Sequence, residues 1–91
     1  MARIRFTQAA RKHRVAAGRA RAVFADPVAI VPVRRAGDTR IMRLFLGDDD
    51  TGRALEVGVI ETEEGDLLVI HTMDLRAKFR PHYDTGKGGM S

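Results

Sequence analysis

The Asp26-Pro27 step divides this 91-residue chain into a helix-forming part and a strand-forming part. The residue before a proline avoids helical backbone angles, so a helix is expected to end here. Thr7 can cap a helix that begins at residue 8. Propensity alone leaves open whether the segment up to residue 25 forms one helix or two. Four apolar residues of this segment recur with the spacing of one helix face: Ala16, Ala20, Val23 and Phe24.

Four segments after Pro27 have the composition and length of β-strands, and short turns separate them. Short connections between successive strands favour antiparallel pairing. Pro32 predicts an edge position for the first strand, and the last strand, the most apolar, is expected to be central. After it, Asp74 can cap a short helix that ends before Pro81. The four segments are residues 28–33, 40–47, 53–61 and 67–73.

These patterns predict an α+β domain in which two N-terminal helices pack on a four-stranded, mainly antiparallel sheet, followed by a short C-terminal helical end. We expect the domain to span residues 1–83 and the glycine-rich residues 84–91 to form a flexible tail.

Side-chain alternation along the strands predicts which residues face the helices. In one strand, Met42, Leu44 and Leu46 form the better core face, which leaves Arg43 on the opposite, open face. In the last strand both faces are almost equally apolar. Directing Leu68, Ile70 and Thr72 toward the helices places Val69, His71 and Met73 opposite. Arg43 and His71 then share the open face.

The charge is unevenly distributed along the chain. It carries 16 basic and 12 acidic residues, a net charge of +4. Residues 1–25 contain no acid, whereas most acids lie in residues 48–66. A basic region attracts polyanions, of which nucleic acid is the commonest. A solvated helix face and a surface for an acidic partner protein stay open as alternatives.

Several classes of protein are disfavoured. Without cysteine there is no disulfide framework or thiolate metal site, and the three histidines lack the spacing of zinc ligands. Asp48 to Gly52 has the look of a calcium loop, but Val59 stands where the bidentate glutamate belongs. No apolar run is long enough for a signal sequence or a membrane span. We therefore expect a cytoplasmic protein with no metal, cofactor or membrane association.

Short motifs follow one another along nearly all of residues 5–83. They are Phe6-x-x-Ala9-Ala10-x-x-His13-Arg14, Ala22-Val23-Phe24-Ala25-Asp26-Pro27, Arg40-Ile41-Met42-Arg43 up to Gly47, Val69-Ile70-His71-Thr72-Met73, Arg76-Ala77-Lys78-Phe79-Arg80 and Tyr83. In this order they resemble the RelE/ParE toxin superfamily, most closely its BrnT-like ribonuclease members. The family usually has an arginine directly after the last strand, whereas this chain has Asp74 there and its nearest arginine is Arg76.

The resemblance implies a metal-independent endoribonuclease that cleaves mRNA, free or on the ribosome. It also implies the toxin component of a bacterial type II toxin–antitoxin system, neutralised by a cognate antitoxin protein. Such cleavage needs a group that transfers protons near neutral pH and a cation that binds phosphate. We expect His71 to be the general acid or base, Arg43 and Arg76 to bind phosphate, and Tyr83 to orient the substrate or stack on a base. Further residues expected to bind RNA are Arg11, Lys12, Arg14, Lys78 and Arg80.

Each of these roles has a structural alternative. His71 can be a partly buried strand residue bonded to the backbone, and Arg43 can pair with Glu56 across the hairpin. The chain is then a non-catalytic module of the same fold that binds nucleic acid or protein through its basic helix. A homodimer formed through the strand edge at residues 28–33 is a third alternative.

Overall fold

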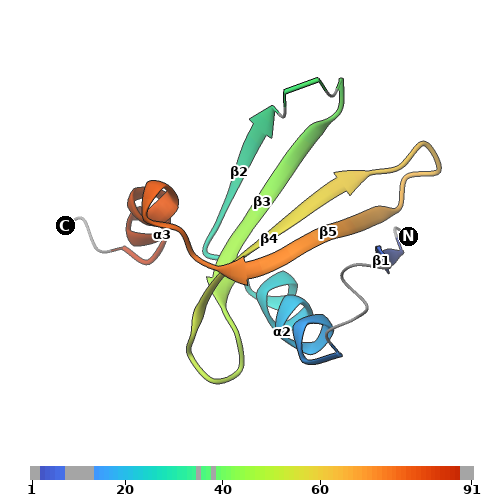
Figure 1. The fold of residues 1–91 in the computed structure, drawn as a ribbon. Coiled ribbons are helices and arrows are strands. Elements are labelled where there is room, and N and C mark those ends of the chain that lie inside the picture. The colour runs from blue at the N-terminus through green and yellow to red at the C-terminus, as the bar shows by residue number, and fades with distance from the viewer. Residues whose placement is uncertain (1–2, 8–13, 35, 38, 89–91) are drawn as a thin grey trace.

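The computed structural model describes residues 3–7, 14–34, 36–37 and 39–88. The described chain forms one five-stranded sheet in the order β1-β5-β4-β3-β2, with helices packed against it (Figure 1). The elements are β1 (Ile4–Phe6), α2 (Arg14–Ala25), β2 (Ala29–Arg34), β3 (Ile41–Asp48), β4 (Ala54–Glu61), β5 (Leu67–Asp74), a 3-10 turn η1 (Ala77–Phe79) and α3 (Arg80–Gly86).

The predicted antiparallel meander is confirmed for β2 to β5, but the predicted fold class is wrong. β1 pairs in parallel with β5, so the sheet is mixed and has five strands instead of four. The described N-terminal part contains one helix, α2, instead of two; residues 8–13, where the first predicted helix begins, lie outside the described residues. β1 has only three residues, too few for a periodic signal, and it forms because the edge of β5 offers unpaired backbone groups.

The position of each strand in the sheet follows its composition only in part. β2, which contains Pro32, is an edge strand as predicted. The central strand is β4, where every residue from Leu55 to Ile60 is buried, and not β5 as predicted. β5 is instead the second strand because β1 covers its outer edge.

α2 covers one face of the sheet with three residues of the predicted apolar stripe; the side chain of the fourth, Ala16, lies outside the described part. Ala20 and Val23 are fully buried against β4 and β5, and Phe24 packs edge to face on Phe45 of β3 with 5.0 Å between ring centroids. The helix ends at Ala25, directly before the Asp26-Pro27 step, as predicted.

The C-terminal segment covers the opposite face. Met42, Leu44 and Leu46 were expected to face the N-terminal helices, but they pack with Phe79 and Tyr83 on the other side of the sheet. In Figure 1, α3 lies beside β2, and α2 lies below the other strands. The prediction assumes helices on only one face of the sheet. In the structure, helical segments cover β3 on both faces, so the alternation of apolar residues along β3 does not show which face packs against α2.

The C-terminal helix begins where the sequence predicted a stop. Pro81 lies in the first turn of α3, where its missing N–H is tolerated. Asp74 caps no helix: it ends β5 and pairs with Arg53. The helix continues through Gly86, three residues past the predicted domain boundary at residue 83. It packs closely on Val28, the residue before β2: a Cβ built on Gly86 would overlap the carbonyl group of Val28.

A bulge between β4 and β5 controls which side chains share a face. Gly58 pairs with His71 and Val59 pairs with Val69, so Ile70 is an extra residue on β5. Val69 therefore packs under α2, while His71 lies on the opposite face. No helix among the described residues is long and apolar enough to cross a membrane.

Candidate active site

A carboxylate lies in the middle of the sheet. Glu56 of β4 is completely buried between Leu46 of β3 and Met73 of β5. An unpaired charge in such a place is costly, so a partner has to be supplied. The partner is Arg76, whose Nε and Nη2 both lie 2.6 Å from Oε1 of Glu56. The backbone N–H of Arg76 also donates to Oε2 at 3.1 Å. Glu56 thereby fixes the path of the chain after β5 and orients the guanidinium.

The imidazole of His71 lies on the same face of the sheet. His71 pairs with Gly58 in the register of β4 and β5, and its ring lies over that glycine, where a Cβ would come within 2.8 Å of Cε1. Nε2 lies 3.7 Å from Oε1 of Glu56, within ion-pair distance when the ring is protonated. The side chain of His71 is 30% exposed. One buried carboxylate therefore faces both an imidazole and a guanidinium.

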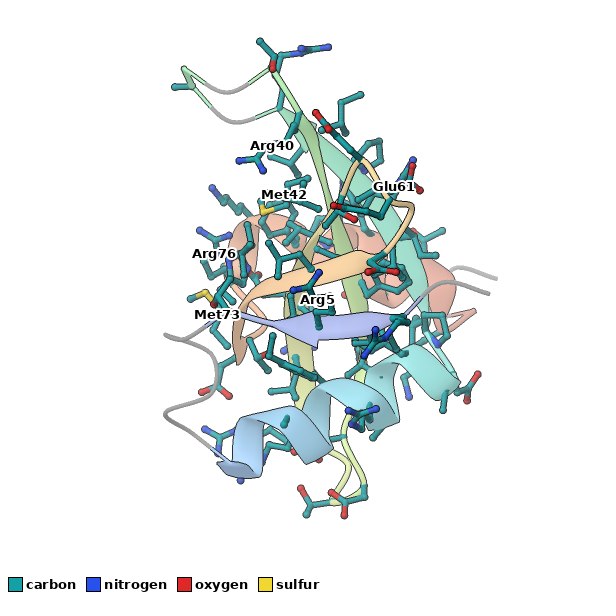
Figure 2. The ribbon with its side chains drawn as sticks, turned by 90° about the vertical axis from the view of Figure 1, so that its right-hand side faces the viewer. Arg5, Arg40, Met42, Glu61, Met73 and Arg76 are labelled. Carbon is teal, nitrogen blue, oxygen red and sulfur yellow. The ribbon has the colours of Figure 1, made fainter. Side chains whose placement is uncertain are left out.

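Arg76 is positioned to bind an anion. Its guanidinium lies over the ring of Phe79, 5.2 Å from the centroid, and its side chain is 39% exposed. The two contacts with Glu56 use Nε–H and one hydrogen of Nη2, so the other guanidinium hydrogens stay open to a second acceptor. We call Glu56, His71 and Arg76 the polar trio. Figure 2 shows Met73 next to Arg76, at the end of β5.

The polar trio can bind a phosphodiester and transfer a proton. Arginine donates parallel hydrogen bonds to phosphate oxygens, and histidine exchanges protons near neutral pH. The carboxylate stabilises the imidazolium that forms when His71 takes a proton. Within the described ranges, no three histidine or acidic side chains come together as metal ligands.

Arg43 does not join this trio. The sequence pattern predicts that Arg43 lies beside His71. Arg43 is two residues from Phe45 on β3, so it lies on the same face as Phe45, the face that packs on α2. His71 lies on the opposite face of the sheet. Arg43 is exposed, and Glu56, its predicted alternative partner, binds Arg76 instead. The prediction fails because the bulge at Ile70 breaks the alternation of β5 and because Phe45, not Leu44, packs against α2.

Tyr83 holds α3 against the sheet. Its hydroxyl donates to Oδ1 of Asp48 at 2.5 Å, and Lys87 donates to Oδ2 of the same carboxylate at 2.5 Å. The hydrogen bonds from Lys87 and Tyr83 hold the pKa of Asp48 below its ordinary value. Burial and the bond to Asp48 raise the pKa of Tyr83, and the bond to Asp48 raises that of Lys87. We call Asp48, Tyr83 and Lys87 the Asp48 clasp. Its hydrogen bonds connect the end of β3 to the C-terminal helix.

The other predicted RNA-binding residues fall into two groups. Arg11 and Lys12 lie outside the described residues, and Arg14 is the first residue of α2, a helix whose opening side chains are not described. Lys78 and Arg80 are both exposed. Nζ of Lys78 lies over the ring of Phe79, as the guanidinium of Arg76 does, whereas the guanidinium of Arg80 lies over the ring of Tyr83.

Sequence reasoning missed two residues of the site. The sequence pattern suggests Glu56 only as a partner of Arg43. It does not point to Gly58 as a residue of the site. The available signal was an acidic residue within an otherwise apolar strand, Leu55-Glu56-Val57-Gly58-Val59-Ile60. Such a residue must be matched by a cation from elsewhere in the chain.

No model of a known protein family matches the chain, and neither a curated protein nor a solved structure is significantly similar to it.

Proposed function

We propose that this protein is a metal-independent endoribonuclease that cleaves single-stranded RNA at the polar trio. The observation that carries the proposal is that Glu56, fully buried, binds Arg76 and lies within ion-pair distance of His71 on a partly exposed face. Here the same carboxylate supports a proton-transferring group and a phosphate-binding group together.

The proposed reaction uses the 2′-hydroxyl of the RNA as the nucleophile. Its oxygen attacks the adjacent phosphorus, and the bond from phosphorus to the 5′-oxygen breaks. The products are a 2′,3′-cyclic phosphate and a 5′-hydroxyl. His71 transfers one of the two protons that move, and water exchanges the other. Arg76 stabilises the charge on the phosphoryl oxygens, and Glu56 holds both side chains in position.

The resemblance to RelE/ParE toxins supports the same activity. The arginine expected directly after the last strand is replaced by Asp74, which binds Arg53, and Arg76 supplies the guanidinium two residues later. We therefore propose that the protein is the toxin of a type II toxin–antitoxin pair, that it acts on mRNA in the cytoplasm, and that an antitoxin protein neutralises it.

Controlled expression in a bacterial host tests this function. Wild type, His71→Ala and Arg76→Ala are compared for growth and for new RNA ends. Arg43→Ala is the matched control, because it removes an exposed arginine from the other face of the sheet. We expect growth arrest and new RNA ends with wild type and Arg43→Ala, and neither with the two variants of the trio. Circular dichroism of the purified variants verifies that they fold. Intact RNA and normal growth with folded wild-type protein contradict the proposal.

A second candidate is an RNA-binding module without cleavage. The observation that favours it is the position of Arg43, because one of the two arginines expected to bind phosphate is not at the site. This candidate predicts salt-dependent binding of RNA that stays intact.

A further inference from the structure

We infer that Met73 is the surface on which a base of the RNA substrate packs, a specificity-determining role that rests on the proposed function. Among the residues that the structure describes, Met73 is one of three large apolar residues that are strongly exposed, at 41%. The other two, Ile30 and Ile41, lie on β2 and β3. Met73 alone adjoins the polar trio: it pairs with Glu56 in the register of β4 and β5, and it lies next to Arg76 in Figure 2.

Its neighbours place Met73 beside the proposed chemistry. His71 and Met73 are two residues apart on β5, so both side chains lie on the same face. Residues directly opposite each other on neighbouring strands have Cβ atoms about 5 Å apart. A phosphate bound by Arg76 therefore lies near both an imidazole and an exposed thioether.

The aromatic side chains do not offer an alternative base platform. Proteins usually bind unpaired RNA bases on open aromatic rings. This chain has four phenylalanines, one tyrosine and no tryptophan, and every ring already contacts another ring or a cation. Phe24 and Phe45 pack on each other, Phe6 lies beneath Arg21, Phe79 beneath Arg76 and Lys78, and Tyr83 beneath Arg80 and Lys87.

Methionine suits the role that these rings cannot fill. Its side chain is unbranched and its sulfur is polarisable, so it adapts to a flat aromatic surface. A base can pack on it only when it is unstacked from its neighbours. The expected substrate is therefore single-stranded RNA with an accessible base next to the cleaved phosphate, and the packing requires no particular base.

The test measures binding to two strands that cannot be cleaved. One is a single-stranded 2′-O-methyl RNA, and the other is the same strand with abasic residues at its central positions. We expect wild type to prefer the strand with bases. Met73→Ala lowers the affinity for that strand about two- to tenfold, the range of a sulfur–aromatic contact, and leaves the affinity for the abasic strand unchanged. Met73→Leu keeps an apolar surface but loses the sulfur, so it retains only part of the preference.

Ile41→Ala is the matched control, because Ile41 is exposed to a similar degree, at 46%, and lies on β3, away from the trio. If Met73→Ala binds both strands as wild type does, the role of Met73 is excluded. The role of Met73 is also excluded if wild type binds both strands equally. If that wild-type protein still cleaves ordinary RNA, the proposed function is unaffected. Wild type that neither binds nor cleaves RNA overturns the proposed function and the role of Met73 with it.

Discussion

The imidazole of His71 lies against the backbone of Gly58, at the point where the register of β4 and β5 changes. A Cβ built on Gly58 would meet Cε1 of His71 at 2.8 Å and both ring nitrogens at 3.0 Å. The ring can occupy this place only because residue 58 has no side chain. The contact sets the position of the proposed proton-transferring group relative to Glu56.

Gly58→Ala is expected to displace the ring of His71. We expect RNA cleavage to fall at least about tenfold and the free energy of unfolding to fall by about 1–3 kcal/mol, as in other overpacked sites. Urea unfolding and a cleavage assay measure both effects. In the double variant Gly58→Ala/His71→Ala the clash is absent, so its stability should exceed that of Gly58→Ala.

Gly18→Ala is the control: Gly18 is exposed on α2 with open space around its Cα, and alanine should stabilise the helix by about 0.5–1 kcal/mol. Cleavage that is unchanged in folded Gly58→Ala protein would show that the position of His71 does not matter.

Glu56→Gln is expected to loosen the segment after β5. The substitution keeps the shape of the side chain but removes the charge that binds Arg76 and faces His71. Hydrogen bonds to charged groups contribute about 1.5–3 kcal/mol, so we expect a loss of about 1–3 kcal/mol in urea unfolding, together with loss of cleavage. Arg76→Lys keeps a positive charge but not the planar fork, and we expect it to fold and to bind RNA more weakly. Equal stability of wild type and Glu56→Gln would mean that the pair is not needed for the fold.

The separation of Arg43 from His71 predicts unequal effects of two arginine substitutions. Arg76→Ala should lower the rate of cleavage about 100-fold or more, because it removes the side chain that stabilises phosphoryl charge. Arg43→Ala should leave the rate within about twofold of wild type, since it lies on the α2 face and surface substitutions are mostly tolerated. Cleavage rates of purified protein at a fixed RNA concentration compare the two. Equal losses would place Arg43 at the site and contradict the arrangement of the sheet.

The Asp48 clasp predicts a dependence of stability on acid. Because hydrogen bonds from Lys87 and Tyr83 lower the pKa of Asp48 in the fold, the unfolded chain binds a proton more readily. The stabilisation is therefore fully present above the ordinary pKa of 3.8 and is lost as the pH falls through the lower value in the folded protein. Thermal unfolding between pH 2 and pH 7 measures this.

Asp48→Asn should lower the midpoint at neutral pH and flatten the acid part of the curve. Tyr83→Phe removes one hydrogen bond to the carboxylate and keeps the ion pair with Lys87, so its effect should be smaller. An acid profile of Asp48→Asn that parallels wild type would assign the acid sensitivity to another carboxylate, such as Asp49. The pKa of Asp49 is also lowered, by hydrogen bonds from Thr51 and Arg53.

Local patterns were sufficient for strands β2 to β5 and for the end of α2, but not for β1 or α3. The strand segments after Pro27 were predicted within about a residue of β2 to β5, because β-branched runs between short turns have few alternatives. The end of α2 at Ala25 follows from Pro27, which restricts its neighbour directly. His71 and Arg76 were predicted at the site from residue type and order, and the structure brings both to Glu56.

The sequence by itself determined the end of α2 and the extended segments β2 to β5, because those preferences arise from neighbouring residues. It did not determine β1 or α3, which form against strands from other parts of the chain. Only the tertiary structure decided which faces meet. The parallel pairing of β1 with β5, the bulge at Ile70 and the return of Arg76 to Glu56 depend on residues far apart in the chain. A single extra residue on β5 reverses the face of every side chain beyond it, because side chains alternate with a period of two. For that reason Arg43 and His71, predicted on one face, lie on opposite faces, and a buried glutamate and a glycine complete the site.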